Sequence, residues 1–487
     1  MTRRLAAALA LLAAVACSPD APAAAPSPSP SASSVSPSPS ASSASPSPAA
    51  TRTASPSPSP NPAVACPASY AAPDPRRPVV DLRFVVGDDK RTVRGSESVT
   101  FTPDRPVDRL VFRLWSNGPA SRRGGGSSRV TKAVVDGRAA TVSTSQSGTL
   151  ASIPLGLTAP AGTAIQADLD FVMTLPSGVN ERWGRSGQTV WFGSGFPLLA
   201  WERGRGWAVE PPTSAFAEAA TSEAFRLTLT VDAPAGDVVL ATGEHVRKAG
   251  RLRVRRAAAV RDVLVAVGPF RVAKGTARGT PVTVGVAPGL SDNPAALLAL
   301  HRSGIAALAD RFGPFPYESL DVAVVPVVSG GIEFPAGIIL GTRQDRDATL
   351  VHEIAHEYFY GLVGDNQGRD PWLDESFATY AEALVRGTGG RYLSTSIPAS
   401  GRNRVGRPMT YWEQHRDDYY RSVYVQGAAA LLRARATVGA AAFDRAIRCY
   451  VNANAHRVAV PADLRRALRA YPAAVAALVR VGALPPG

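Results

Sequence analysis

Two histidines and a glutamate in the second half of the chain have a spacing that suits metal chemistry. His352, Glu353 and His356 form an H-E-x-x-H pattern. Residues four apart lie on one face of a helix, so both imidazoles can turn a ring nitrogen toward the same point. That arrangement suits a zinc ion, and the glutamate can serve as a general base. The alternative, two ordinary histidines on a buried helix, is disfavoured because the chain has only six histidines and chance matches are rare.

A catalytic zinc site needs a third protein ligand and one position left open for water. Glu375 is the candidate, because eighteen residues separate it from His356 and it lies in the run WLDESFATYAE. That run predicts a second helix, with Leu373 and Phe377 on one side. Between the two helices, residues 364–371 have the composition of a turn.

This stretch resembles the zinc aminopeptidases of the aminopeptidase N family. Members share H-E-x-x-H, a spacer of eighteen residues and a glutamate within a W-L-N-E-G-F-A-like run. The corresponding run here has Asp374 in place of Asn and Ser376 in place of Gly. Neither departure removes a metal ligand. The resemblance implies one Zn²⁺ per chain, held by the ligands His352, His356 and Glu375.

A second motif precedes the histidines. Gly330 to Phe334 has the position and shape of the G-x-M-E-N motif of the family, with Ile332 for Met and Phe334 for Asn. The resemblance implies an edge strand, including Gly330 and Gly331, that pairs with the substrate backbone. It also implies that Glu333 binds the free α-amine, and a cationic amine in a closed pocket does need a carboxylate partner. The alternative is a solvated glutamate on an edge strand.

A third match lies after the metal-binding helices. Ser422 to Gly427 resembles the Y-E-K-G segment of the family, with Val425 and Gln426 replacing the charged pair. The resemblance implies that the hydroxyl of Tyr424 donates to the oxyanion of the reaction. The alternative is a helical tyrosine that packs into the core.

Together these features predict a zinc-dependent aminopeptidase that hydrolyses N-terminal residues of peptides. Glu353 would take a proton from the attacking water and pass it to the leaving amine. A zinc endopeptidase, or a peptidase of blocked termini, stays open as an alternative. Phe334 alters the amine-binding motif, and no clear match exists to the second amine-binding residue that the family takes from its β domain. A non-catalytic, zinc-stabilised surface binding protein is a further alternative, although a structural site has no use for Glu353.

The predicted fold class is α+β, with a β-rich N-terminal domain at 66–275 and a thermolysin-like, mainly helical zinc catalytic domain at 276–487. Alternating apolar and polar residues in Ile165–Met173 and Phe225–Val231 indicate half-buried strands. A β-rich domain before the catalytic domain fits the aminopeptidase N family. Too few residues follow Tyr424 for the large C-terminal helical repeat domain of many relatives, so we expect the two-domain form without it.

The pattern changes where the catalytic domain begins. A short strand at Pro281–Val286 is followed by a helix that Ser291 or Asn293 caps, with Pro294 in its first turn. His301 lies on the apolar stripe of that helix. We interpret it as a core or surface histidine and not as a metal ligand.

Residues 1–17 have the features of a signal peptide of the lipoprotein type. Arg3 and Arg4 precede an apolar run that is too short to span a bilayer, and small residues precede Cys17. This cysteine resembles that of a bacterial lipobox, although Ala14 stands where Leu is usual. We expect lipidation of Cys17 and anchoring to the outer face of the bacterial cell membrane, with secretion as the alternative. Either route takes the protein out of the cytoplasm.

Residues 18–65 are dominated by Ser, Pro and Ala and lack large apolar side chains, which predicts a disordered tether. Cys66 and Cys449 remain as an even pair in an oxidising compartment, so a disulfide between them is favoured although spacing alone cannot prove proximity.

The expected partners are peptide substrates and, through the lipid on Cys17, the membrane. The chain of 487 residues has a net charge of +14 that comes almost entirely from arginine. No basic patch interleaved with aromatic residues lies on a recognisable module, so we do not expect a nucleic-acid partner. The sequence leaves the oligomeric state open.

Overall fold

The computed structural model describes residues 66–214, 222–342 and 345–486. The predicted signal peptide, the tether and the lipidation site Cys17 lie outside the described residues. The chain divides into two units, Met1–Ala63 and Val64–Gly487, and the second contains every element described below.

The first half of the described chain is built from β-strands, as the period-two pattern predicts. Along its largest sheet, buried and more exposed residues alternate, because successive side chains point to opposite faces. Within the described residues this sheet has eight strands, in the spatial order β16 (Glu244–Ala249), β17 (Leu252–Val260), β14 (Phe225–Asp232), β1 (Val79–Val86), β2 (Thr92–Phe101), β8 (Ile165–Thr174), β4 (Ser127–Val135) and β5 (Arg138–Ala139).

Smaller sheets accompany the large one in the β-rich region. The first contains β15 (Val238–Ala241), β18 (Leu264–Gly268), β10 (Thr189–Gly193) and β9 (Trp183–Ser186). The second contains β11 (Leu198–Leu199), β3 (Val107–Arg113), β7 (Leu150–Ala159) and β6 (Ser143–Ser145). A short ribbon pairs β12 (Trp201–Glu202) with β13 (Gly206–Trp207), and one short helix, α1 (Pro119–Arg123), lies in this region.

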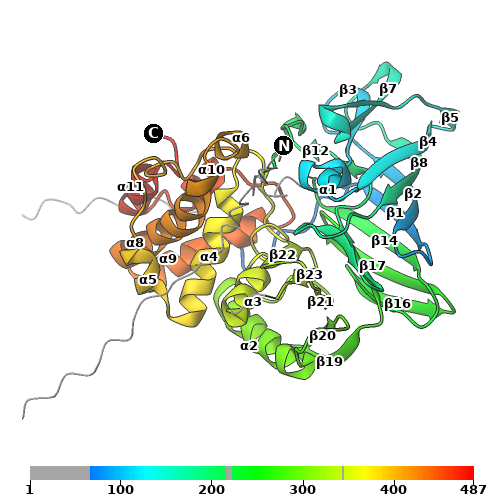
Figure 1. Cartoon of the computed structure of the whole chain (residues 1–487). Helices are drawn as coiled ribbons and strands as arrows, with labels where there is room; N and C mark the ends of the chain where they lie inside the picture. The colour runs from blue at the N-terminus through cyan, green and yellow to red at the C-terminus, as the bar shows by residue number, and fades with distance from the viewer. Residues whose placement is uncertain (1–65, 215–221, 343–344, 487) are drawn as a thin grey trace, which may run out of the picture. The chain divides into compact units, whose positions relative to one another are not determined.

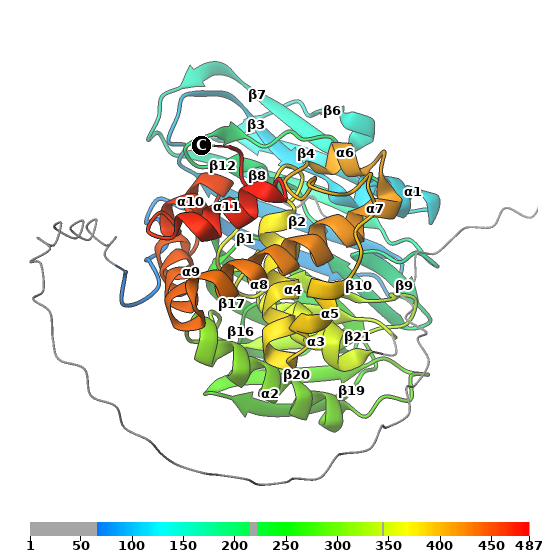
Figure 2. The same cartoon turned by 90° about the vertical axis from the view of Figure 1, so that its left-hand side faces the viewer.

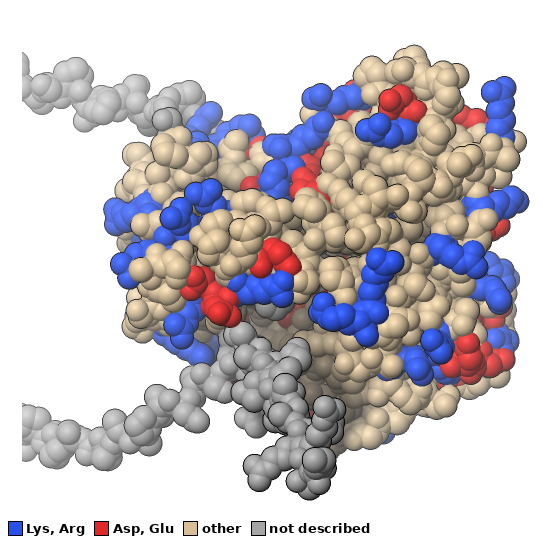
Figure 3. Space-filling view, turned by 45° about the horizontal axis from the view of Figure 1, so that its top comes forward, with Lys and Arg blue, Asp and Glu red and all other residues tan. Residues whose placement is uncertain are grey.

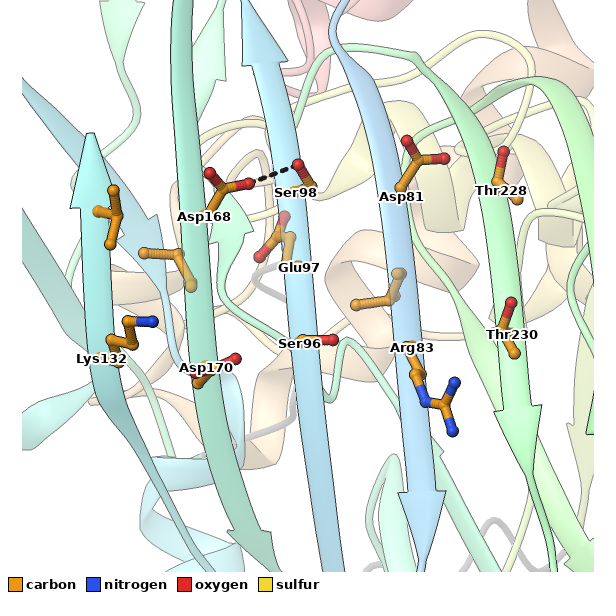
Figure 4. A pocket seen from close by; sticks show the side chains of 13 residues that line it. Asp81, Arg83, Ser96, Glu97, Ser98, Lys132, Asp168, Asp170, Thr228 and Thr230 are labelled. Atoms are coloured by element: carbon orange, nitrogen blue, oxygen red, sulfur yellow. Dashed lines mark hydrogen bonds between the residues drawn. The ribbon is translucent and has the colours of Figure 1, made fainter. Parts of the chain in front are cut away.

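Polar side chains cover the outer face of the eight-stranded sheet. They line a hollow of about 350 Å³ across strands β1, β2, β4, β8 and β14 (Figure 4). Asp168 accepts a hydrogen bond of 2.6 Å from Ser98 there. None of the predicted site residues lines this hollow.

The second half of the described chain combines a mixed sheet with helices. The sheet runs in the order β19 (Arg271–Ala277), β20 (Thr280–Val286), β21 (Leu320–Val324), β23 (Gly337–Leu340) and β22 (Gly331–Phe334). Its pairings β20–β21 and β21–β23 are parallel, and β22 pairs with β23 in the antiparallel sense at the edge. Figure 1 shows this sheet and its helices on one side of the unit and the strands of the β-rich region on the other.

The helices confirm the predicted α+β class. They are α2 (Pro294–Phe312), α3 (Arg346–Ala355), α4 (Trp372–Arg386), α5 (Gly389–Ser394), α6 (Met409–Trp412), α7 (Arg416–Tyr419), the π-helix η3 (Tyr420–Gln426), α8 (Gly427–Val438), α9 (Ala440–Asn454), α10 (Pro461–Ala467) and α11 (Pro472–Arg480). In Figure 2 the helices α4, α8 and α9 lie in front of the sheets.

Local chemistry explains how α2 begins. Asn293 and not Ser291 is the cap, because its side chain accepts a hydrogen bond of 2.9 Å from the amide of Ala295. Pro294 occupies the first helical position, where its missing N–H costs nothing. His301 on this helix is fully buried, so of the two placements predicted for it the structure shows the core one.

Helix α3, which carries His352, ends well before the predicted turn at 364–371, and that turn lies outside both helices as expected. It stops at Ala355, and the amide of Gly361 then reaches five residues back to the carbonyl of His356 at 2.8 Å. Tyr360 is buried and adopts a φ of 109°, a conformation incompatible with a continuing helix. The backbone therefore leaves the helical conformation at Tyr360, and α4 begins only at Trp372.

The β-rich and helical regions share one core. A continuous cluster of buried apolar side chains extends from Val80 in β1 to Leu484 after α11. The predicted domain boundary at 275/276 falls inside β19, which begins at Arg271 and belongs to the sheet of the helical region.

A disulfide and buried ions join distant parts of the described chain. Cys66 and Cys449 form the disulfide that the sequence favours, and it ties the start of the described body to α9. Arg255 of β17 forms a buried ion pair of 2.8 Å with Asp321 of β21. These contacts fix the β-rich region against the helical one.

Charged side chains are widely distributed over the surface. On the face drawn in Figure 3, Lys and Arg side chains are spread among acidic ones over many elements. Among the described helices, none has both the length and the apolar character needed to cross a membrane.

Candidate active site

The three predicted metal ligands converge. His352 lies in the last turn of α3, His356 caps its C-terminus, and Glu375 lies in the first turn of α4. The Oε2 atom of Glu375 is 3.1 Å from Nε2 of His352 and 3.5 Å from Nε2 of His356. One ligand atom from each residue lies within 4.8 Å of the other two. The packing of α3 against α4 thus brings one carboxylate to the point that both imidazoles face.

Both imidazoles also contact a second carboxylate through Nδ1. The Nδ1 atom of His356 contacts Asp374, and that of His352 lies 3.9 Å from Glu382. Glu382 in turn accepts hydrogen bonds from the hydroxyl of Tyr392 at 3.1 Å. Carboxylates behind the Nδ1 atoms orient metal-binding histidines and leave Nε2 to face the metal. Asp374, a departure from the family pattern, therefore lies where it can orient His356.

Burial and charge compete at these ligands. Burial alone would raise the pKa of Glu375, but His356 and His352 hold it below its usual range. Burial would lower the pKa of His356, but Asp374 and Glu375 raise it well above its usual value. The carboxylates therefore favour positive charge on the imidazoles, and a divalent cation can supply that charge in place of protons.

Glu353 lies against the edge strand β22. Its side chain is buried, and its Oε2 atom has no hydrogen-bond partner among the described residues. Burial raises its pKa to about 8, while the nearby charges of His352 and His356 act in the opposite direction. A Cβ atom on Gly331 would lie 2.2 Å from Cγ of Glu353, so only glycine allows this approach. Gly330, by contrast, has no atom within 4 Å of such a position.

Glu333 occupies the same space from β22. Its carboxylate, that of Glu353 and the ring of His356 each offer an atom within 4.8 Å of the others. Its Oε1 atom accepts hydrogen bonds from Arg182 and, at 3.0 Å, from Gln367. Burial would raise the pKa of Glu333, but the guanidinium of Arg182 holds it below its usual value. Glu333 is thus an ionised, buried carboxylate beside the metal ligands.

Phe334 does not face the metal ligands. Successive residues of a strand point to opposite faces, and the Phe334 side chain is buried on the face opposite Glu333. A Cβ atom on Gly193 would lie only 1.9 Å from the Phe334 ring, so that glycine makes room for it. The departure from the family motif at this position therefore changes the packing on the face of the strand opposite Glu333.

Tyr424 lies beside the metal ligands on the π-helix η3. Its ring stacks on that of His352, with 5.8 Å between centroids and 10° between planes. π-Helical turns are rare and occur often at functional sites, because they rotate one side chain out of the regular helical series. The structure thus brings Tyr424 to the site that its sequence match implies.

The sequence did not indicate two residues of this site. Arg182 precedes β9 in the β-rich region, and Gln367 lies in the connection between α3 and α4. Neither belongs to a pattern with a recognisable period or spacing. Only the absence of a clear match to the family's second amine-binding residue drew attention to the β-rich region.

Comparison with known proteins agrees with this geometry. Residues 340–481, which contain the metal ligands and Tyr424, match the model of the peptidase family M1 domain. This part of the chain is therefore similar to the peptidase family M1 domain. Aminopeptidase N of Streptomyces lividans is 25% identical over 242 residues, which cover 42% of this chain and 28% of that protein. Aminopeptidase O of Mus musculus is 36% identical over 97 residues, which cover 18% of this chain and 12% of that protein. The matches thus span less than a third of these relatives.

The fold extends the similarity beyond the M1 domain. The M1 zinc metallopeptidase from Deinococcus radiodurans superposes with a TM-score of 0.62 and 22% identity, covering 85% of this chain and 96% of that chain. A mutant of that protein bound to a Tyr-Ser-Ala substrate gives the same values. The β-rich region and the helical region of this chain therefore have the fold of M1 zinc metallopeptidases.

The residues present fit the zinc ion that this family uses. Two imidazole nitrogens and one carboxylate oxygen form a donor set typical of catalytic zinc, which leaves a position for water. The carboxylates at both Nδ1 atoms complete the arrangement. His352, His356 and Glu375 would hold the ion within the M1 domain.

Proposed function

We propose that this protein is a zinc aminopeptidase, which removes N-terminal residues from peptides. The observation that carries the proposal is the position of Glu333. An ionised carboxylate on an edge strand lies within 4.8 Å of both the base Glu353 and the ligand His356. A substrate whose α-ammonium contacted that carboxylate would bring its first peptide bond to the metal ligands. The same contact would exclude a longer chain on the amino side.

The chain's own residues divide the work of hydrolysis among them. Zinc, when bound, would polarise the scissile carbonyl and make the attacking water more acidic. Glu353 would accept a proton from that water and return it to the leaving nitrogen as the C–N bond breaks. The hydroxyl of Tyr424 would donate to the carbonyl oxygen as negative charge develops there. Gly331, where the edge strand β22 begins, and the preceding Gly330 would pair with the substrate backbone.

The substitution Glu333→Gln tests the proposal. It keeps the size of the side chain and one acceptor oxygen but removes the charge. A charge-assisted contact is worth about 1.5–3 kcal/mol, so kcat/KM for a free-amine peptide should fall roughly ten- to a hundredfold or somewhat more. Hydrolysis of the same peptide with an acetylated N-terminus should change little. Equal losses on both substrates would contradict a role for Glu333 in amine binding.

A zinc endopeptidase, or a peptidase of blocked termini, is the second candidate. One observation favours it: Glu333 already pairs with the guanidinium of Arg182, so part of its charge is compensated inside the protein. Efficient cleavage of the acetylated peptide by the unmodified protein would support this candidate and contradict aminopeptidase activity.

We also propose that the protein works outside the cytoplasm, anchored through a lipid on Cys17. The sequence of residues 1–17 supports export, and the Cys66–Cys449 disulfide is typical of oxidising compartments. Replacing the anchor residue, as Cys17→Ser, should move the protein from the membrane fraction to the medium. Continued membrane association of that variant would argue against lipidation.

A further inference from the structure

The β-rich region contributes a buried guanidinium to the subsite around Glu333. Arg182 lies just before β9 and its side chain is only 2% exposed. Its Nη2 atom donates to Oε1 of Glu333, and its Nη1 atom donates to the main-chain carbonyl of Glu333 at 3.1 Å. Its guanidinium also lies 5.1 Å from the ring centroid of Phe334. One arginine thus holds the side chain and the backbone of the same strand residue.

Gln367, from the helical region, donates a hydrogen bond to the same oxygen of Glu333. Its Nε2 atom donates to Oε1 of Glu333 at 3.0 Å and to Oδ2 of Asp374 at 2.7 Å. Asp374 contacts the metal ligand His356. Among the described residues, the hydrogen bonds of the Glu333 carboxylate therefore engage Oε1 only, and Oε2 is the oxygen left for a substrate.

The segment that carries Arg182 also holds the loop before the edge strand. The side chain of Asn180 donates to the hydroxyl of Ser329 at 2.8 Å and accepts from the amide of Ser329 at 3.1 Å. Asn180 therefore holds the loop before β22, and Arg182 holds the strand itself at Glu333. The β-rich region sets where the strand lies, although it contributes no metal ligand.

We propose that Arg182 is a positioning residue for the amine subsite, which holds Glu333 so that Oε2 alone receives the α-ammonium of the substrate. The proposal rests on the proposed aminopeptidase function and deepens it. A glutamate side chain has several rotatable bonds and would lose its orientation without partners. The planar, two-pronged guanidinium restricts it in a way that a single ammonium group cannot.

The test uses the ratio of kcat/KM for a free-amine peptide to that for its acetylated form, measured on the zinc-loaded full chain. Arg182→Met should lower this ratio by about tenfold or more, because the carboxylate no longer meets the ammonium in a fixed geometry. Arg182→Lys should lower it by a smaller factor, since lysine restores the charge but not the fork. The double variant Arg182→Met with Glu333→Gln should lose no more than Glu333→Gln alone, because the arginine acts through the glutamate.

A matched control separates positioning from general damage. Arg255 forms a buried ion pair with Asp321 that also joins the β-rich and helical regions. Arg255→Met removes a pair of the same kind and should leave the ratio unchanged even where it lowers thermal stability. Zinc content, measured on every variant, should stay at about one per chain.

The outcomes are distinct. If the unmodified protein prefers the free amine but Arg182→Met keeps that preference, the positioning role is overturned while the proposed function stands. Losses that add in the double variant overturn it as well, because they imply independent effects. If Arg182→Met does not fold, an unchanged ratio in Arg182→Lys has the same meaning. No free-amine preference in the unmodified protein overturns the proposed function and this role together.

Discussion

The metal ligands and the amine subsite lie side by side but are assembled in opposite ways. The predicted ligands His352, His356 and Glu375 come from two consecutive helices, within a short stretch of chain. The amine subsite combines Glu333 with Arg182 from the β-rich region and Gln367 from an irregular connection. Its parts therefore come from positions up to 185 residues apart in the sequence.

The two sites therefore depend on the fold to different degrees. Helix geometry fixes the two imidazoles of the metal site, so few tertiary contacts are needed to complete it. The amine subsite exists only where the β-rich region meets β22, because Arg182 reaches Glu333 across that interface. Changes in packing between the two regions should therefore affect substrate choice before they affect metal binding. The predictions below test that order.

The largest effect is expected from removal of a metal ligand. His356→Ala should lose most of the zinc and nearly all hydrolysis, because two remaining ligands hold the ion poorly. Zinc analysis and peptide hydrolysis measure both losses. The matched control is His301→Met, which removes a buried histidine outside the metal site and should keep the zinc. Full zinc occupancy in His356→Ala would contradict the ligand assignment.

The next effect separates chemistry from metal binding at the same site. Glu353→Gln should keep zinc and thermal stability but lower kcat by roughly 10²–10⁴-fold, because the amide cannot accept the proton of the attacking water. Single-turnover hydrolysis measures the chemical step directly. Activity within tenfold of the unmodified protein would remove Glu353 from the mechanism.

A smaller effect tests the contact between the two sites. Gly331→Ala places a methyl group 2.2 Å from Cγ of Glu353, so either the strand or the base must move. We expect a fall in kcat of about a hundredfold, typical of a misplacement of about 1 Å, with zinc retained. Gly330→Ala is the matched control, since nothing lies within 4 Å of its new methyl group. Equal activity in the two variants would show that the close approach of Gly331 to Glu353 does not affect hydrolysis.

The two sites also differ in how well the sequence predicted them. The motif around His352 and His356 can be found from the sequence alone, because its four-residue spacing matches the period of a helix. Alternation likewise indicated the strands, and a local hydrogen bond explains why Asn293 caps α2. Glu333 was found only through a family motif, and its partner Arg182 had no local signal at all. A contact between separate regions leaves no periodic trace in either of them.

The differences between expectation and structure have the same origin. The predicted turn at 364–371 lies between α3 and α4 as expected, but the connection is longer than that turn, because α3 ends at Ala355 and the backbone at Tyr360 leaves the helical conformation. The boundary predicted at 275/276 falls within β19, since that strand pairs with β20 across a hairpin. Both details depend on tertiary packing, which propensity and spacing do not encode.

The smallest predicted effect concerns a histidine that has no carboxylate partner. His301 on α2 is as buried as the metal ligand His356, but its Nδ1 atom meets only the carbonyl of Leu297, at 2.8 Å. Its Nε2 atom has no partner among the described residues. Burial therefore lowers its pKa to about 4 from an ordinary value near 6.5. Burial acts on His356 too, but there the carboxylates of Asp374 and Glu375 raise the pKa, and His301 has no such carboxylates.

The sign of the pH dependence follows from that shift. A histidine whose folded pKa is depressed contributes its full stability above the unfolded pKa, and loses it as pH falls toward the folded pKa. Between pH 7.5 and pH 5.5, His301 should lower the free energy of unfolding by roughly 1 kcal/mol. Denaturant unfolding of the unmodified protein and of His301→Met at several pH values measures the difference. His456, whose pKa burial also lowers to about 4, is present in both proteins and cancels, as does any release of zinc in acid. Parallel stability curves for the two proteins would mean that the pKa of His301 is the same in the folded and unfolded states, and would contradict the lowered pKa.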